Sequence, residues 1–164
     1  RKGLIYEKVR RLDGFAPFAQ VINLTEPPDD IAPFDVDLLE TFARVYLANA
    51  KTRGGVITFI HGVTGPGAVC LMAACLLPDI GRVALRYAWQ ASAALYAAIG
   101  REIDRAPCDA YDESIEGLVT RAVETGDEHA VKFTEVCLRA HRMDPRPIFL
   151  AAARHAVERL GRPA

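Results

Sequence analysis

The side chains best suited to chemistry lie on one expected helix, TGDEHAVKFTEVCLRAH, which covers residues 125–141. His129 and Lys132 are three residues apart, so a helix places them about one turn apart on the same face. Val136 and Ala140 extend this face with apolar side chains, and we therefore expect it to point toward the core. An imidazole and an amine that face a core need partners there, because burying either group alone is costly.

The start of this helix carries a signal of its own. Thr125 followed by Glu128 is a capping box, in which each side chain can accept a backbone N–H of the other residue. Asp127 and Glu128 add negative charge to the first turn, where the helix dipole favours it. The pattern predicts a helix over about 127–141.

Lys132 has two interpretations. Glu128 precedes it by four residues, the spacing of a solvent-exposed ion pair on a helix. Alternatively, His129 and Lys132 bind a metal together, since imidazole is a good ligand for iron or zinc. A protonated lysine has no lone pair, so Lys132 would bind only as a neutral amine or after carbamylation to an oxygen ligand. The spacing alone does not choose between the two.

The other histidines stand in different settings. His61 lies just before the glycine-rich stretch GVTGPG, and it is either a hydrogen-bonded core residue or a ligand aimed into a cavity by a kink. His141 lies between arginines near the helix end and is expected in solvent. His155 is expected to be a half-buried packing residue of the last helix. The turn around Pro66 matches no phosphate-binding loop.

Apolar spacing predicts an all-α, compact multi-helix domain over residues 1–164. A helix is expected from Asp35 or Asp37 to about Asn49, with Asp37 and Glu40 as a capping pair. We expect a short helix ending near His61, a bend, and a second buried helix from about Pro66. The longest helices are expected over about 80–99, 127–141 and 147–160, with the first substantially buried.

Composition limits the classes of function. The chain has 164 residues, is 51% hydrophobic and carries a net charge of −1, so neither a nucleic-acid partner nor an anionic membrane is indicated. The longest apolar run, Ala68 to Pro78, is too short to span a bilayer.

The chain has four cysteines, Cys70, Cys75, Cys108 and Cys137. No CxxC spacing occurs, so reduced thiols and a cytoplasmic location are expected. Because the first residue is Arg1, we expect a processed product or part of a longer polypeptide.

Three segments resemble the questin oxidase-like family. They are FIHGVTGPGAV (59–69), RYAWQASAALYAAI (86–99) and GDEHAVKFTEVCLRAHRMDPRPIFLAAARHAV (126–157). Their order and spacing are similar to the C-terminal half of those proteins over most of residues 35–160. The most specific part is DEHAVKFTE followed by a DP-containing turn and the FLAAA helix. Members are mainly helical oxygenases that act on anthraquinones and related aromatics, through NADPH-linked or non-haem-iron chemistry.

The resemblance implies a metal site made by His61, His129 and a carbamylated Lys132, with iron as the metal and NADPH as a possible reductant. Family members are longer at the N-terminus, where further ligand histidines lie, and no histidine precedes His61 here. A second chain or an N-terminal half would then complete the site, unless this member is degenerate. We also expect a larger apolar surface than a free monomer shows, because residues 56–77 are so apolar.

Two other functions fit the sequence. A non-catalytic helical domain that binds an apolar ligand or a partner subunit would explain the incomplete ligand set. A zinc hydrolase is the weaker choice, because no motif places an acidic general base.

Overall fold

Every element of the computed structural model is helical in the residues it describes, 5–102 and 113–161. The all-α prediction is confirmed. The long helices are α3 Ala32–Asn49, α4 Arg53–Ala73, α5 Pro78–Ile99, α6 Ile115–Glu124, α7 Glu128–Met143 and α8 Pro147–Leu160. Short helical segments precede them: α1 Ile5–Val9, η1 Arg10–Leu12, α2 Ala16–Ala19 and η2 Gln20–Leu24.

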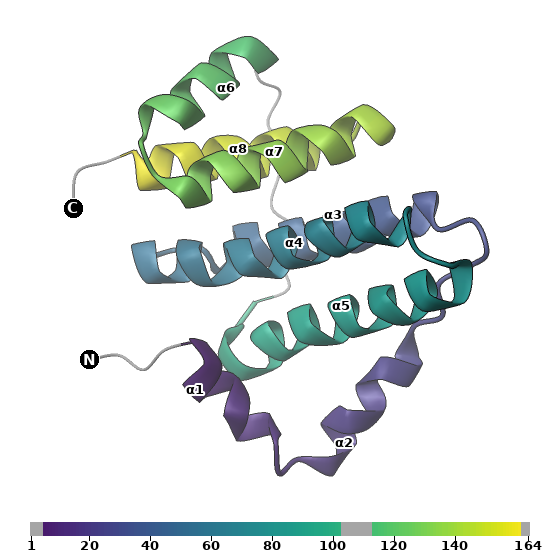
Figure 1. The fold of residues 1–164 in the computed structure, drawn as a ribbon. Helices are drawn as coiled ribbons and strands as arrows, with labels where there is room; N and C mark the ends of the chain where they lie inside the picture. Colours follow the sequence, from purple (N-terminus) through teal and green to yellow (C-terminus); the bar gives the residue numbers. More distant parts are fainter. Residues whose placement is uncertain (1–4, 103–112, 162–164) are drawn as a thin grey trace.

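Helix α4 lies at the centre of the bundle. It packs against α3, α5, α7 and α8, and Figure 1 shows it between α5 on one side and α7 with α8 on the other. Helix α6 covers α7 and α8, whereas α1 and η2 pack on α5. The core is one cluster of apolar side chains centred on the fully buried Tyr46, Phe133 and Phe149.

The expected bend in residues 56–77 is wrong, because α4 runs unbroken through 21 residues with Pro66 inside it. Proline has no N–H, so the carbonyl four residues earlier, that of Gly62, loses its helical donor. Ser92 of α5 replaces that donor, since its hydroxyl donates to the Gly62 oxygen at 2.8 Å in a buried position. A neighbouring helix therefore satisfies the carbonyl that Pro66 leaves unpaired.

The other long helices lie where they were predicted, but some begin or end a few residues away from the predicted boundaries. Helix α3 begins at Ala32, several residues before Asp35, and takes Pro33 into its first turn. The expected helices over 80–99 and 147–160 are present. However, α3 and α4 are both longer than α7 and α8, so the prediction that α7 and α8 are among the longest helices is wrong. Cys70, Cys75 and Cys137 are free thiols, and Cys108 lies outside the described residues.

Helix α4 has the length and apolar composition of a membrane-spanning helix. Within the described ranges it is the one helix long and apolar enough to cross a bilayer, and 56% of its most apolar window is buried inside the fold. That burial is typical of the core helix of a bundle. Several of the exposed apolar side chains lie near the end of α4 and the start of α5, including Leu77, Ile80, Val83 and Tyr87.

The helix over 80–99 was expected to be substantially buried, but α5 is buried on one side only. Val83 and Tyr87 are 50% and 60% exposed, whereas Leu85 and Ala88 are buried. An apolar stripe remains on its outer side.

Candidate functional site

His61 of α4 and His129 of α7 lie side by side. Their ring centres are 5.5 Å apart and the ring planes meet at 76°, an edge-to-face arrangement. Both line one cavity of about 380 Å³, together with Ile60, Thr64, Gly65 and Lys132. As expected, His61, His129 and Lys132 converge on one cavity; their roles as ligands remain predictions.

His61 reaches this cavity from within a continuous helix. It lies in α4, and Gly65, one turn later, has open space where a Cβ would stand. Partial burial lowers the pKa of His61, and electrostatic interactions with His129 and Lys132 lower it further, against a smaller opposing effect of Glu128. The neutral imidazole, which carries the lone pair a metal requires, is therefore favoured.

His129 is held by the residue that caps its helix. The cap of α7 is Asp127, whose Oδ1 accepts the backbone N–H of His129 at 2.9 Å. The Thr125–Glu128 capping box is therefore wrong: Gly126, with φ of 65°, turns the chain, and Thr125 Oγ1 accepts the N–H of Asp127 instead. Glu128 becomes the first helical residue.

The ring of His129 contacts the same carboxylate. Its Nδ1 lies 3.0 Å from Asp127 Oδ1, and Arg53 Nη2 lies 3.2 Å from Asp127 Oδ2. Burial alone would raise the pKa of Asp127, but hydrogen bonds from the backbone and ring of His129, with the charge of Arg53, hold it below its ordinary value. The carboxylate is thus ionised at neutral pH.

Lys132 meets the cavity only at its rim. Its side chain is 64% exposed, and its amine forms an ion pair with Glu128. The expectation that Lys132 faces the core is therefore wrong. Val136 and Ala140 are buried as expected, but toward the start of α7 the buried residues are Ala130 and Phe133, and Lys132 lies outside. In this state the amine is an ion-pairing cation rather than a ligand.

Two residues of this site were missed by sequence reasoning. Asp127 was considered only as a charge in the first helical turn, although a DxH pattern at a helix start allows one carboxylate to accept from both the backbone and the ring. Arg53 carried no signal, since it lies 74 residues before Asp127 in the sequence. Among the described residues, no group of three or more His, Cys, Asp or Glu side chains is placed to hold a metal.

The remaining histidines serve packing. His155 Nδ1 lies 2.9 Å from the hydroxyl of the fully buried Tyr46, so its expected role as a packing residue is consistent with this structure. His141 Nδ1 lies 3.1 Å from the carbonyl of Arg146 and is half-buried rather than in solvent.

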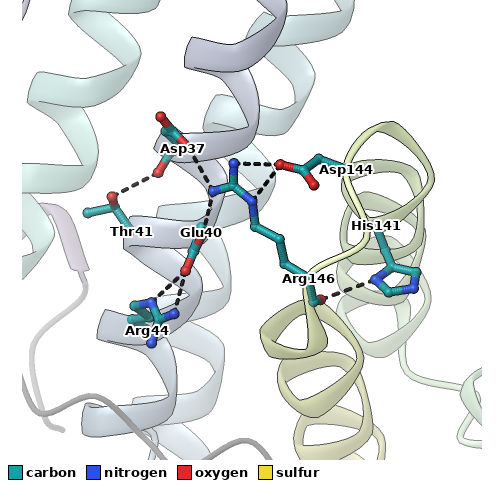
Figure 2. A network of polar contacts seen from close by, with 7 residues as sticks. All are labelled: Asp37, Glu40, Thr41, Arg44, His141, Asp144 and Arg146. Atoms are coloured by element: carbon teal, nitrogen blue, oxygen red, sulfur yellow. Dashed lines mark hydrogen bonds and ion pairs between the residues drawn. The ribbon is translucent and has the colours of Figure 1, made fainter.

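A second polar cluster surrounds Arg146 in the turn between α7 and α8. Figure 2 shows its guanidinium between Asp37 and Glu40 of α3 and Asp144 of the turn itself. Glu40 also pairs with Arg44. Asp37 and Glu40 therefore lie inside α3 and do not cap it, which corrects the expectation. The cluster joins the α7–α8 turn to α3, and we assign it a structural role.

This cluster predicts a pH-dependent contribution to stability. Burial raises the pKa of Glu40, but hydrogen bonds and charge from Arg146 and Arg44 lower it below its ordinary value overall. A lowered pKa in the folded state adds stability above the unfolded-state pKa, and this is lost as the pH falls through the folded-state value. We expect the difference in unfolding free energy between wild type and Glu40→Gln, about 1–3 kcal/mol at neutral pH, to shrink toward pH ~3.

Urea denaturation at both pH values measures this difference. Asp13→Asn is the control, because Asp13 is 71% exposed and pairs with Arg10 at 3.8 Å. A Glu40→Gln effect that is equal at both pH values would contradict the assignment.

Comparison with known proteins gives no relative for this site: no family model, no curated protein and no solved structure matches the chain.

Proposed function

We propose that this domain is the metal-binding part of an iron-dependent oxygenase that acts on an aromatic, anthraquinone-type substrate. His61 and His129 are its two protein ligands. The observation that carries the proposal is their edge-to-face pairing at the cavity, with ring centres 5.5 Å apart. Two imidazoles on one tetrahedral metal, with bonds of about 2.0–2.1 Å, have ring centres roughly 5 Å apart.

The surroundings of the pair favour this chemistry. A carboxylate behind a histidine ligand is a common feature of metal sites, because it orients the ring and raises its basicity. The cavity of about 380 Å³ lies within the range of roughly 300–1,000 Å³ of small-molecule sites. Iron held there would supply the binding and activation of dioxygen, and the protein would orient the aromatic substrate beside it. Two histidines leave positions open for substrate, dioxygen or further ligands.

The test uses the whole chain. Ferrous iron is added without oxygen, excess metal is removed, and bound iron is counted by mass spectrometry. We expect one iron per chain, and oxygen uptake that depends on a hydroxylated anthraquinone, measured with and without NADPH. A chain that retains no iron would overturn the proposal.

Lys132→Met tests the third ligand that the resemblance implies. In the structure its amine is paired with Glu128, so we expect Lys132→Met to retain metal. Affinity should rise slightly, because a positive charge near the metal is removed. Cobalt titrations with and without bicarbonate measure this. Wild-type binding that requires bicarbonate and is lost in Lys132→Met would instead establish a carbamylated Lys132 as a ligand.

The exposed apolar stripe of α5 favours a second candidate function, a non-catalytic domain that binds a partner subunit. Val83 and Tyr87 are 50% and 60% exposed on the outer side of that helix. The iron measurement separates the two functions, since a subunit-binding domain needs no metal at His61 and His129.

A further inference from the structure

The Asp127 carboxylate is shared between a backbone group, a ring and a guanidinium. Oδ1 accepts the His129 N–H at 2.9 Å and lies 3.0 Å from His129 Nδ1, while Oδ2 accepts from Arg53 at 3.2 Å. The Asp127 side chain is 17% exposed, so water has little access to it. One short side chain thus contacts the start of α7, the imidazole and the first residue of α4.

These contacts decide which ring nitrogen carries the proton. An ionised carboxylate is only an acceptor, so the Nδ1 that faces it must donate. In the neutral imidazole, the other nitrogen then carries the lone pair. Nε2 of His129 makes no hydrogen bond to the described part of the chain, while its ring lines the cavity beside His61.

We propose that Asp127 is a positioning residue that fixes His129 in the Nδ1–H form and so presents the Nε2 lone pair to the cavity. Its consequence for metal affinity rests on the proposed function; the choice of tautomer does not. Because α7 begins at Glu128, the same carboxylate fixes the helix start and the ring orientation together.

Arg53 holds the carboxylate in this position. It is the first residue of α4, the helix that carries His61, and it also donates to the carbonyl of Leu160 at the end of α8 at 3.4 Å. The guanidinium of Arg53 therefore connects the start of α4 with the start of α7 and the end of α8. Through Asp127 it links the start of the helix with His61 to the ring of His129.

Asp127→Ser separates the two roles of Asp127. Serine is an equally good cap, so the start of α7 is kept, but its hydroxyl is too short to reach Nδ1 as well. The tautomer is read from long-range ¹H–¹⁵N spectra of the metal-free protein at about pH 8.5, roughly two units above the ordinary histidine pKa. Zinc affinity is measured by competition with a chelator. Glu128→Gln is the matched control, because that neighbouring carboxylate pairs with Lys132.

We expect the Nδ1–H form of His129 in wild type and Glu128→Gln. Asp127→Ser should shift the ring to the Nε2–H form and weaken zinc binding by about 10–100-fold, with unchanged helix content. Arg53→Met should act in the same direction to a smaller extent. An Nε2–H ring in wild type, or an Nδ1–H ring in Asp127→Ser, would overturn the proposal.

The two proposals fail separately. Zinc that does not bind to wild type counts against the metal site, while an Asp127-dependent tautomer in the same sample upholds the positioning role. Zinc that binds wild type and Asp127→Ser equally, with the same tautomer in both, overturns the positioning role and leaves the metal site standing.

Discussion

Replacing either His61 or His129 with glutamine is expected to weaken cobalt or zinc binding by more than about 100-fold, beyond the 10–100-fold loss typical of a residue behind a ligand. Each change removes one of the two imidazoles that line the cavity in the described part of the chain. A single remaining histidine with an open coordination sphere holds a first-row metal weakly. Glutamine keeps the helix, because its intrinsic propensity is high.

Cobalt absorption and chelator competition measure the loss, and thermal unfolding confirms that the variants remain folded. His141→Gln is the control on the same helix, since His141 contacts the Arg146 carbonyl in the turn beyond α7. Equal affinity in wild type and both variants would show that the metal does not bind in this cavity. A loss of affinity in only one variant would show that only that histidine is a ligand.

The sequence was sufficient to predict the all-α class and several of the long helices. Apolar spacing is a local property, and it located α5, α7 and α8 within a few residues. The convergence of His61 and His129 on one cavity was expected from a kink beside His61 and from the resemblance. The two histidines do line one cavity, although α4 is continuous at His61.

What the sequence could not show depends on contacts between distant residues. Lys132 was expected to face the core because Val136 and Ala140 lie near its side of the helix. Val136 and Ala140 are buried, but beside them Phe133 lies inside and Lys132 outside. The edge of the buried face is set by packing against α4 and α8. Arg53, likewise, meets Asp127 only because the starts of α4 and α7 lie together.

The continuity of α4 shows the same limit most clearly. A proline preceded and followed by glycine normally ends or kinks a helix, and the sequence therefore predicted a bend. The compensating group, Ser92, lies 30 residues from Gly62 on another helix. No local pattern connects a serine of α5 with a carbonyl of α4.

Ser92→Ala is accordingly expected to lower the unfolding free energy by about 1–3 kcal/mol, the cost of leaving a buried acceptor unpaired. Ser92 is 2% exposed, and its hydroxyl is the donor to the Gly62 carbonyl at 2.8 Å. The loss should be smaller when Pro66 is also alanine, because residue 66 then has an N–H that can bond this carbonyl within the helix. Urea denaturation of wild type, both single variants and the double variant gives the coupling between the two positions.

We expect a coupling of at least about 0.5 kcal/mol, the lower end for residues that share a partner. Pro147→Ala is the control proline: Pro147 is the first residue of α8, where no helical donor is required. Its combination with Ser92→Ala should be additive within about 0.3–0.5 kcal/mol. If Pro66→Ala and Ser92→Ala are also additive, Ser92 does not replace the missing donor. The unbroken path of α4 past His61 would then depend on its packing against α3, α5, α7 and α8.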